Sequence, residues 1–173
     1  FITFLPSFMT NLNYSRVKIG AVISANLLVD NLSKSAVGWL VDHRGPWPVL
    51  LAGSITAFLG IMLIVFFHQS LLLLIIAAVL IGLGVAPTWP ASISGSIQTV
   101  GEEKRATIIS VISTVWLAGG GIGPVLMGFL IDTRLLRQYL GGFQLPVNAY
   151  NTGFNILFAV AVLAVVISIF GLI

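Results

Sequence analysis

An acid and a base four residues apart are the groups in this sequence best placed to do chemistry. Asp30 and Lys34 lie in an otherwise apolar stretch, and Asn26 and Gly38 continue the same spacing. Residues at i and i+4 share one face of a helix, so the spacing predicts a polar stripe. Lys34 could hold an anionic or polar group and Asp30 could exchange a proton. The simpler interpretation, which stays open here, is a buried ion pair in which the two charges only neutralise each other.

The composition places these charges in a membrane protein. Of 173 residues, 58% are hydrophobic, only 8% are charged and none is cysteine. A soluble domain carries about 25% charged residues, and thirteen charges cannot cover a globule of this size. The absence of cysteine excludes a disulfide scaffold, a Cys-ligated zinc site and a thiol nucleophile. The net charge of +3 does not point to nucleic acid as a partner.

The apolar runs are long enough to form membrane-spanning helices, each of which needs about 20 residues. We expect one all-α polytopic bundle formed by residues 1–173, with five complete transmembrane helices and a truncated first helix. The complete helices are predicted at residues 18–41, 47–67, 70–97, 106–131 and 150–173, and residues 1–10 are predicted to end a first helix that begins upstream. Charges inside a bilayer usually face a partner or a water-filled cavity. The polar stripe should therefore face the centre of the bundle.

Residues 38–48, which read GWLVDHRGPWP, form a tight reversal between two predicted helices. Gly45 permits a backbone that other residues resist, and the prolines suit the first turn of the next helix. The string resembles the GxLaDrxGrk signature of the major facilitator superfamily. The matching residues are Gly38, Leu40, Asp42, Arg44 and Gly45. The basic residues that the signature has after its last glycine are replaced here by Pro46, Trp47 and Pro48.

A second string, GGGIGPVLMG at residues 119–128, resembles the GxxxGPxxGG motif of antiporters in the same superfamily. Gly119 and Gly123 share a helix face and would admit a neighbouring helix closely, and Gly128 ends the motif. Pro124 removes a backbone hydrogen bond and is expected to kink the helix. Ordinary packing of small residues is the alternative interpretation of this string.

The resemblance implies a half of a transporter, most similar to the N-terminal half, that works with a second six-helix half by alternating access. The implied activity is secondary active transport, such as proton-coupled antiport or efflux of a small polar, amphiphilic or lipid-like solute. In the superfamily the loop of Asp42 is cytoplasmic and latches onto helix ends of the other half. This would also put the turn at residues 102–105 on the cytoplasmic side of a cell membrane, which the divided loop charges alone do not decide.

Two shorter segments resemble the lipoteichoic acid glycolipid flippases of that superfamily. They read LLVDN at residues 27–31 and GLGVAPTW at residues 82–89. The resemblance implies that Asp30 corresponds to an acid that lines a hydrophilic central pocket. Pro87 and Pro90 predict a break in the span at 70–97, and broken helices line cavities in transporters. Trp89 and Trp116 are candidates for stacking on a ligand, although a packing role is the simpler interpretation.

The competing classes of function are an intramembrane enzyme and a membrane scaffold or assembly subunit. The sequence contains no HExxH motif, no GxGD aspartates and no GxSG serine with a partnered histidine. We therefore expect no enzyme activity, cofactor or metal. A scaffold remains the alternative to a transporter, but a scaffold would need neither charges inside a span nor a broken helix. The expected partners are the lipid bilayer, the second half, a small-molecule substrate and protons.

Overall fold

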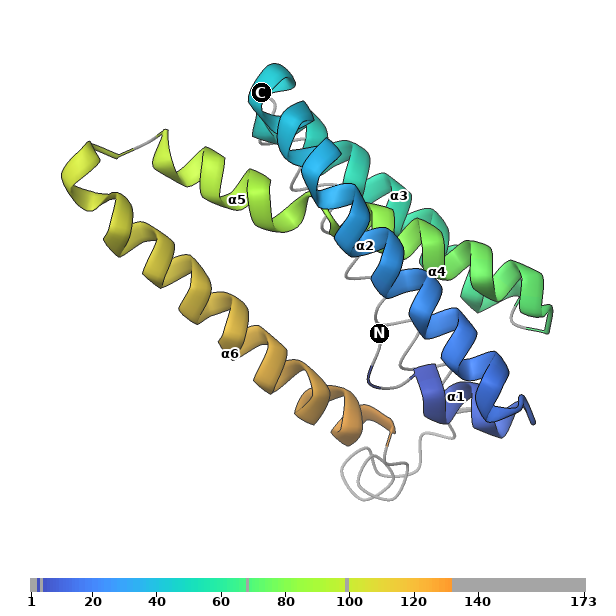
Figure 1. Ribbon diagram of the computed structural model, residues 1–173. Coiled ribbons are helices and arrows are strands. Elements are labelled where there is room, and N and C mark those ends of the chain that lie inside the picture. Colours follow the sequence, from blue (N-terminus) through green and yellow to red (C-terminus); the bar gives the residue numbers. More distant parts are fainter. Residues whose placement is uncertain (1–2, 4, 68, 99, 132–173) are drawn as a thin grey trace.

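The computed structural model describes residues 3, 5–67, 69–98 and 100–131, and the secondary structure of this part is entirely helical (Figure 1). The helices are α1 (Leu5–Asn11), α2 (Arg16–Arg44), α3 (Pro46–Phe67), α4 (Leu71–Val85), α5 (Thr88–Ile97), the short 3₁₀ helix η1 (Glu102–Lys104) and α6 (Arg105–Ile131). This confirms the predicted all-α helical bundle. The predicted loop at 132–149 and the span at 150–173 lie outside the described residues.

Three stretches of the described chain are long and apolar enough to cross a membrane. They are Pro46–Phe67, Leu71–Ile97 and Glu102–Leu126. The helix α2 is not among them, although its 29 residues exceed the length of a span. The reason is its polar stripe, since Asn26, Asp30 and Lys34 lower the hydropathy of its central turns. The span predicted at 18–41 therefore remains a prediction.

The helix α4 lies at the centre of the described bundle, where it packs against both α2 and α3 (Figure 1). The larger hydrophobic core surrounds its first half and includes Leu74, Ala77, Ala78 and Ile81. The short helix α1 closes this end of the bundle with the buried residues Leu5, Phe8 and Met9. By contrast, α6 runs apart from α2, α3 and α4 and meets the bundle through α5 (Figure 1).

The span predicted at 70–97 is divided, as its prolines indicated, but the interruption is short. Helix α4 ends at Val85 and α5 begins at Thr88, with Pro87 between them. Pro90 lies in the first turn of α5, where proline is tolerated, and does not break the helix. The backbone keeps right-handed helical angles at Ala86 and Pro87, so no extended segment separates the two helices.

A second, smaller hydrophobic core packs α5 against the turn that joins α2 and α3. Val41, Val49 and Ala91 are buried together at this end of the bundle. The turn itself is a single residue, Gly45, whose φ is 81° and ψ 164° and whose N–H donates to the Val41 carbonyl oxygen. This region of backbone angles is essentially restricted to glycine. The sequence-based expectation that Gly45 supplies an unusual backbone is therefore confirmed.

Replacing Gly45 with alanine (G45A) should destabilise the protein by about 1–3 kcal/mol, the usual cost of such a backbone in another residue. A Cβ at this position would meet nothing within 4 Å, so the cost comes from the backbone alone. G38A is the matched control, because Gly38 also has open space but lies inside helix α2. Alanine there should stabilise the helix by about 0.5–1 kcal/mol. Thermal unfolding of the full-length protein in detergent measures both, and equal shifts would contradict the assignment.

Candidate functional site

The polar stripe of α2 forms as predicted, but its members lie in different surroundings. Asn26 is only 4% exposed and lies inside the contact between α2 and α4. Its Nδ2 donates a hydrogen bond of 2.8 Å to the carbonyl oxygen of Ala78. Gly38, three turns further along, is partly exposed, and a Cβ there would touch nothing within 4 Å. The stripe therefore begins in a helix contact and becomes open toward the end of α2.

Asp30 and Lys34 form the ion pair that their spacing allows. The Lys34 Nζ donates to the Asp30 Oδ2 at 2.9 Å and to the Asn31 Oδ1 at 3.3 Å. The Lys34 side chain is 41% exposed and that of Asp30 is 20% exposed, so the ammonium group is the more open member of the pair. The lysine could thus reach a further anionic or polar group without leaving α2.

The second carboxylate oxygen of Asp30 is in an unusual position. The Oδ1 atom is buried, and no described residue gives it a hydrogen bond. Buried polar atoms without a partner are rare and costly, particularly on a charged group. Asp30 therefore presents one oxygen that is paired with Lys34 and one that no described residue binds.

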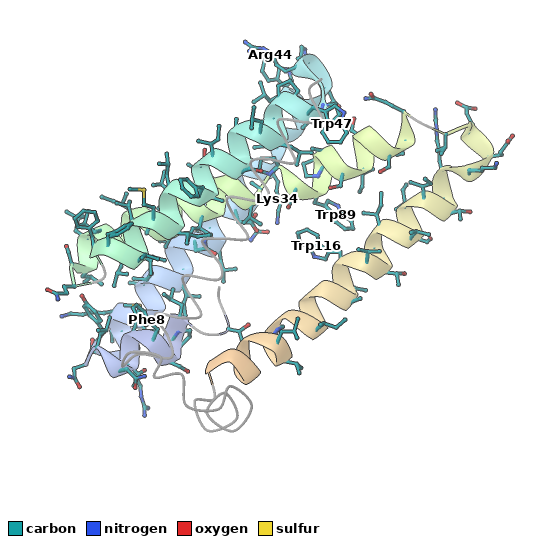
Figure 2. All side chains as sticks on the ribbon, turned by 180° about the vertical axis from the view of Figure 1, so that it is seen from behind. Phe8, Lys34, Arg44, Trp47, Trp89 and Trp116 are labelled. Carbon is teal, nitrogen blue, oxygen red and sulfur yellow. The ribbon has the colours of Figure 1, made fainter. Side chains whose placement is uncertain are left out.

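Trp89 and Trp116 contact each other across α5 and α6. Their ring centroids are 5.8 Å apart at an interplanar angle of 73°, an edge-to-face arrangement. Figure 2 shows the two rings pointing toward one another between the helices. Such a pair typically adds about 0.5–1.5 kcal/mol beyond the burial of its surface. The described structure thus gives both rings the packing contact that was the simpler interpretation, and the ligand role remains a prediction.

The turn that contains the first motif projects from the end of the bundle, where Figure 2 labels Arg44 and Trp47. Asp42 lies in the last turn of α2 and is exposed. Its carboxylate has no hydrogen bond or ion pair with any residue in the described part of the chain. The carbonyl groups at a helix C-terminus disfavour a negative charge. Among the described residues, none therefore binds the Asp42 carboxylate.

The residues around Asp42 are held by local contacts that the sequence did not indicate. The Nδ1 of His43 lies 2.8 Å from the carbonyl oxygen of Trp39, and the two rings are 4.2 Å apart. Between α5 and α6, Arg105 at the start of α6 pairs with Glu102 of η1 at 3.3 Å on an exposed surface.

No helix of the described structure packs closely on the glycines of the α6 motif. The helix continues through Pro124 as far as Ile131. A Cβ built at Gly119, Gly123 or Gly128 would meet nothing within 4 Å. If a helix packs closely on this face, it comes from outside the described residues. The packing role of this motif therefore stays a prediction.

The glycines that do allow close packing lie in α3 and α4, and the sequence analysis gave them no packing role, although Gly82 begins the segment at residues 82–89. A Cβ on Gly82 would lie 2.7 Å from the Asn26 carbonyl oxygen, and one on Gly60 would lie 2.9 Å from that of Ala77. Glycines inside long apolar helices are the available signal, because such residues mark helix contacts in membranes. That signal does not reveal the partner helix. Among the described residues, no cluster of three His, Cys, Asp or Glu could hold a metal ion.

Comparison with known proteins adds a family and a set of relatives. The family model described as Major Facilitator Superfamily matches residues 1–173. Curated relatives named proton-coupled antiporter flippase LtaA, from Staphylococcus aureus strains USA300, NCTC 8325 / PS 47 and COL, are each 29% identical to this chain over 137 residues. The match covers 79% of this chain and 33% of each relative, so the chain spans about a third of their length. No solved structure matches the chain.

Proposed function

This chain belongs to the Major Facilitator Superfamily, and on that premise we propose that it is part of a secondary active transporter that works by alternating access. The family resemblance inferred from the two motifs is thereby confirmed. The family and the apolar helices also support a multi-pass membrane protein. We assign the chain to the N-terminal six-helix half, which would rock against a second half around a site near the middle of the membrane.

The observation that carries this proposal is the Asp30–Lys34 pair on the polar face of α2. Placing one charged side chain at the centre of a bilayer costs about 2.5–3.5 kcal/mol on insertion scales. A structural ion pair would offset part of this cost by satisfying both groups fully. Here Lys34 is 41% exposed and the Asp30 Oδ1 has no described partner, so the pair is only partly satisfied. This incomplete pairing favours a role in binding or proton exchange.

We propose that the transport is coupled to protons and that the substrate is a small polar, amphiphilic or lipid-like solute. The relatives support this proposal, because their name describes a proton-coupled antiporter and a flippase. In this proposal Asp30 exchanges the proton and Lys34 holds an anionic or polar group of the substrate. Asn26 binds α2 to α4 at the start of this pathway. Trp89 on α5 and Trp116 on α6 would line the rest of the pathway.

Replacing Asp30 with asparagine should abolish transport that is driven by a proton gradient, because the amide keeps the shape of the side chain but cannot exchange a proton. The assay uses the full-length protein in lipid vesicles with an imposed pH gradient and a fluorescently labelled glycolipid as the probe. Transport by D30N should fall to the level of vesicles without protein.

Two controls accompany this measurement. D30E, which keeps the carboxylate, should retain part of the transport, and a protonophore should reduce the wild-type protein to the level of D30N. Unchanged gradient-driven transport by D30N would remove Asp30 from the mechanism. A wild-type protein that leaves the labelled glycolipid in place would exclude the lipid-like substrate.

We further propose that the Asp42 turn is a conformational latch on the cytoplasmic side. Asp42 is exposed and has no partner among the described residues, while it lies at the unfavourable end of its own helix. The N-terminus of a helix from the other half would stabilise this charge. The second core, formed by Val41, Val49 and Ala91, would transmit the contact from the turn to α5.

Neutralising Asp42 (D42N) should shift the full-length transporter from the outward-facing toward the inward-facing state. A contact between a charge and a helix dipole is worth up to about 1 kcal/mol at an exposed site, which would change the ratio of the two states about fivefold. Distances between spin labels on the two halves report this ratio. E103Q is the control, since Glu103 is an exposed acid on the other turn. Distance distributions that are identical in D42N and the wild type would contradict the latch.

A further inference from the structure

The backbones of α2 and α4 approach each other closely at Gly82, beside Asn26 and Asp30. A Cβ on Gly82 would lie 2.7 Å from the carbonyl oxygen of Asn26 and 3.2 Å from the backbone nitrogen of Asp30. Both are backbone atoms, so a side chain at Gly82 could be accommodated only if the helices moved apart. The missing side chain of Gly82 thus determines how closely α4 covers the turn of α2 that holds Asp30.

A hydrogen bond fixes the register of the same contact. The Asn26 amide donates to the carbonyl oxygen of Ala78, four residues before Gly82 on α4. Asn26 likewise lies four residues before Asp30 on α2. The hydrogen bond and the close approach therefore hold two successive turns of each helix against each other, and α2 can neither slide nor rotate without losing one of them.

The two oxygens of Asp30 lie in different surroundings. Oδ2 faces Lys34, whose side chain is 41% exposed, whereas Oδ1 is buried without a described partner. The ion pair uses Oδ2 only, so it leaves Oδ1 without a hydrogen bond from Lys34. The helix α4 lies beside this residue, since a Cβ built on Gly82 would be 3.2 Å from the Asp30 backbone nitrogen.

We propose that Gly82 is a positioning residue for Asp30, and that Asn26 assists it. The close approach keeps bulk water from Oδ1 in the described conformation. A proton or hydrogen-bond donor would therefore reach this oxygen only when the helices move during the transport cycle. This inference rests on the proposed role of Asp30 in transport. The burial of Oδ1 itself can be measured without transport.

The test measures how fast a water-soluble carbodiimide, together with an amine, modifies Asp30 in the purified full-length protein. Either the added amine or the neighbouring Lys34 amine can displace the urea from the activated Asp30, so peptide mass spectrometry quantifies both amides together. The exposed Asp42 in the same sample is the internal reference. G82A should raise the modification rate of Asp30 several-fold relative to the wild type, because α4 must retreat from α2.

The matched control is G60A. Gly60 is as crowded as Gly82, with the Ile81 side chain at 2.7 Å and the Ala77 carbonyl oxygen at 2.9 Å from its Cβ position. It lies on α3, however, so alanine there loosens the α3–α4 contact and not the α2–α4 contact. Modification of Asp30 in G60A should remain at the wild-type rate.

N26A gives a second, independent variant, because it removes the hydrogen bond to Ala78 without adding volume. It should also speed the modification of Asp30, and it decides the question if G82A does not fold. Rates at Asp30 that are the same in N26A, G82A and G60A would overturn the positioning role. That outcome would leave the D30N transport result untouched, so the two proposals fail separately.

Discussion

The close contact between α2 and α4 is the interaction on which the rest of the described structure depends. Helices in lipid gain little from hydrophobic burial and associate through close packing and interhelical hydrogen bonds. At this contact Gly82 removes the steric barrier and Asn26 supplies the hydrogen bond to Ala78. The helix α2 is polar because it carries the Asp30–Lys34 pair. The contact with α4 gives such a helix packing that its composition alone would not provide.

The same contact connects the charge pair to the more peripheral parts of the bundle. Three residues after Gly82 the helix α4 ends at Val85, and α5 continues from Thr88. The helix α5 reaches the Asp42 turn through the core at Ala91 and reaches α6 through the edge-to-face pair of Trp89. The charge pair, the turn and α6 are therefore connected through α4 and α5.

The sequence alone predicts the helices well, because a helix that crosses lipid needs a long run of apolar residues. Charge-free runs predict spans at 47–67 and 106–131, and the structure places helices at Pro46–Phe67 and Arg105–Ile131. The i, i+4 spacing also allows the ion pair of Asp30 and Lys34, which the sequence leaves open as the simpler interpretation and which is present in the structure. These features depend on local periodicity and composition, which a single sequence contains in full.

What the sequence does not contain is the choice of partner for each helix face. The glycines at 119–128 look more suited to close packing than Gly82, yet Gly82 makes the contact in the described structure. The burial of a single carboxylate oxygen and the pairing of Trp89 with Trp116 likewise depend on residues far away in the chain. The prolines predict an interruption, but only tertiary packing determines that it is short.

Gradient-driven movement of the labelled glycolipid by the double variant D30N/D42N tests the central claim most directly. The claim is that the chain is part of a transporter whose α2 carries both the proton site and the latch. The account predicts that the full-length double variant, inserted in vesicles at the wild-type level, moves no probe above the background of protein-free vesicles. Transport at the wild-type rate would show that neither charge takes part in transport, as expected if α2 served only as a scaffold.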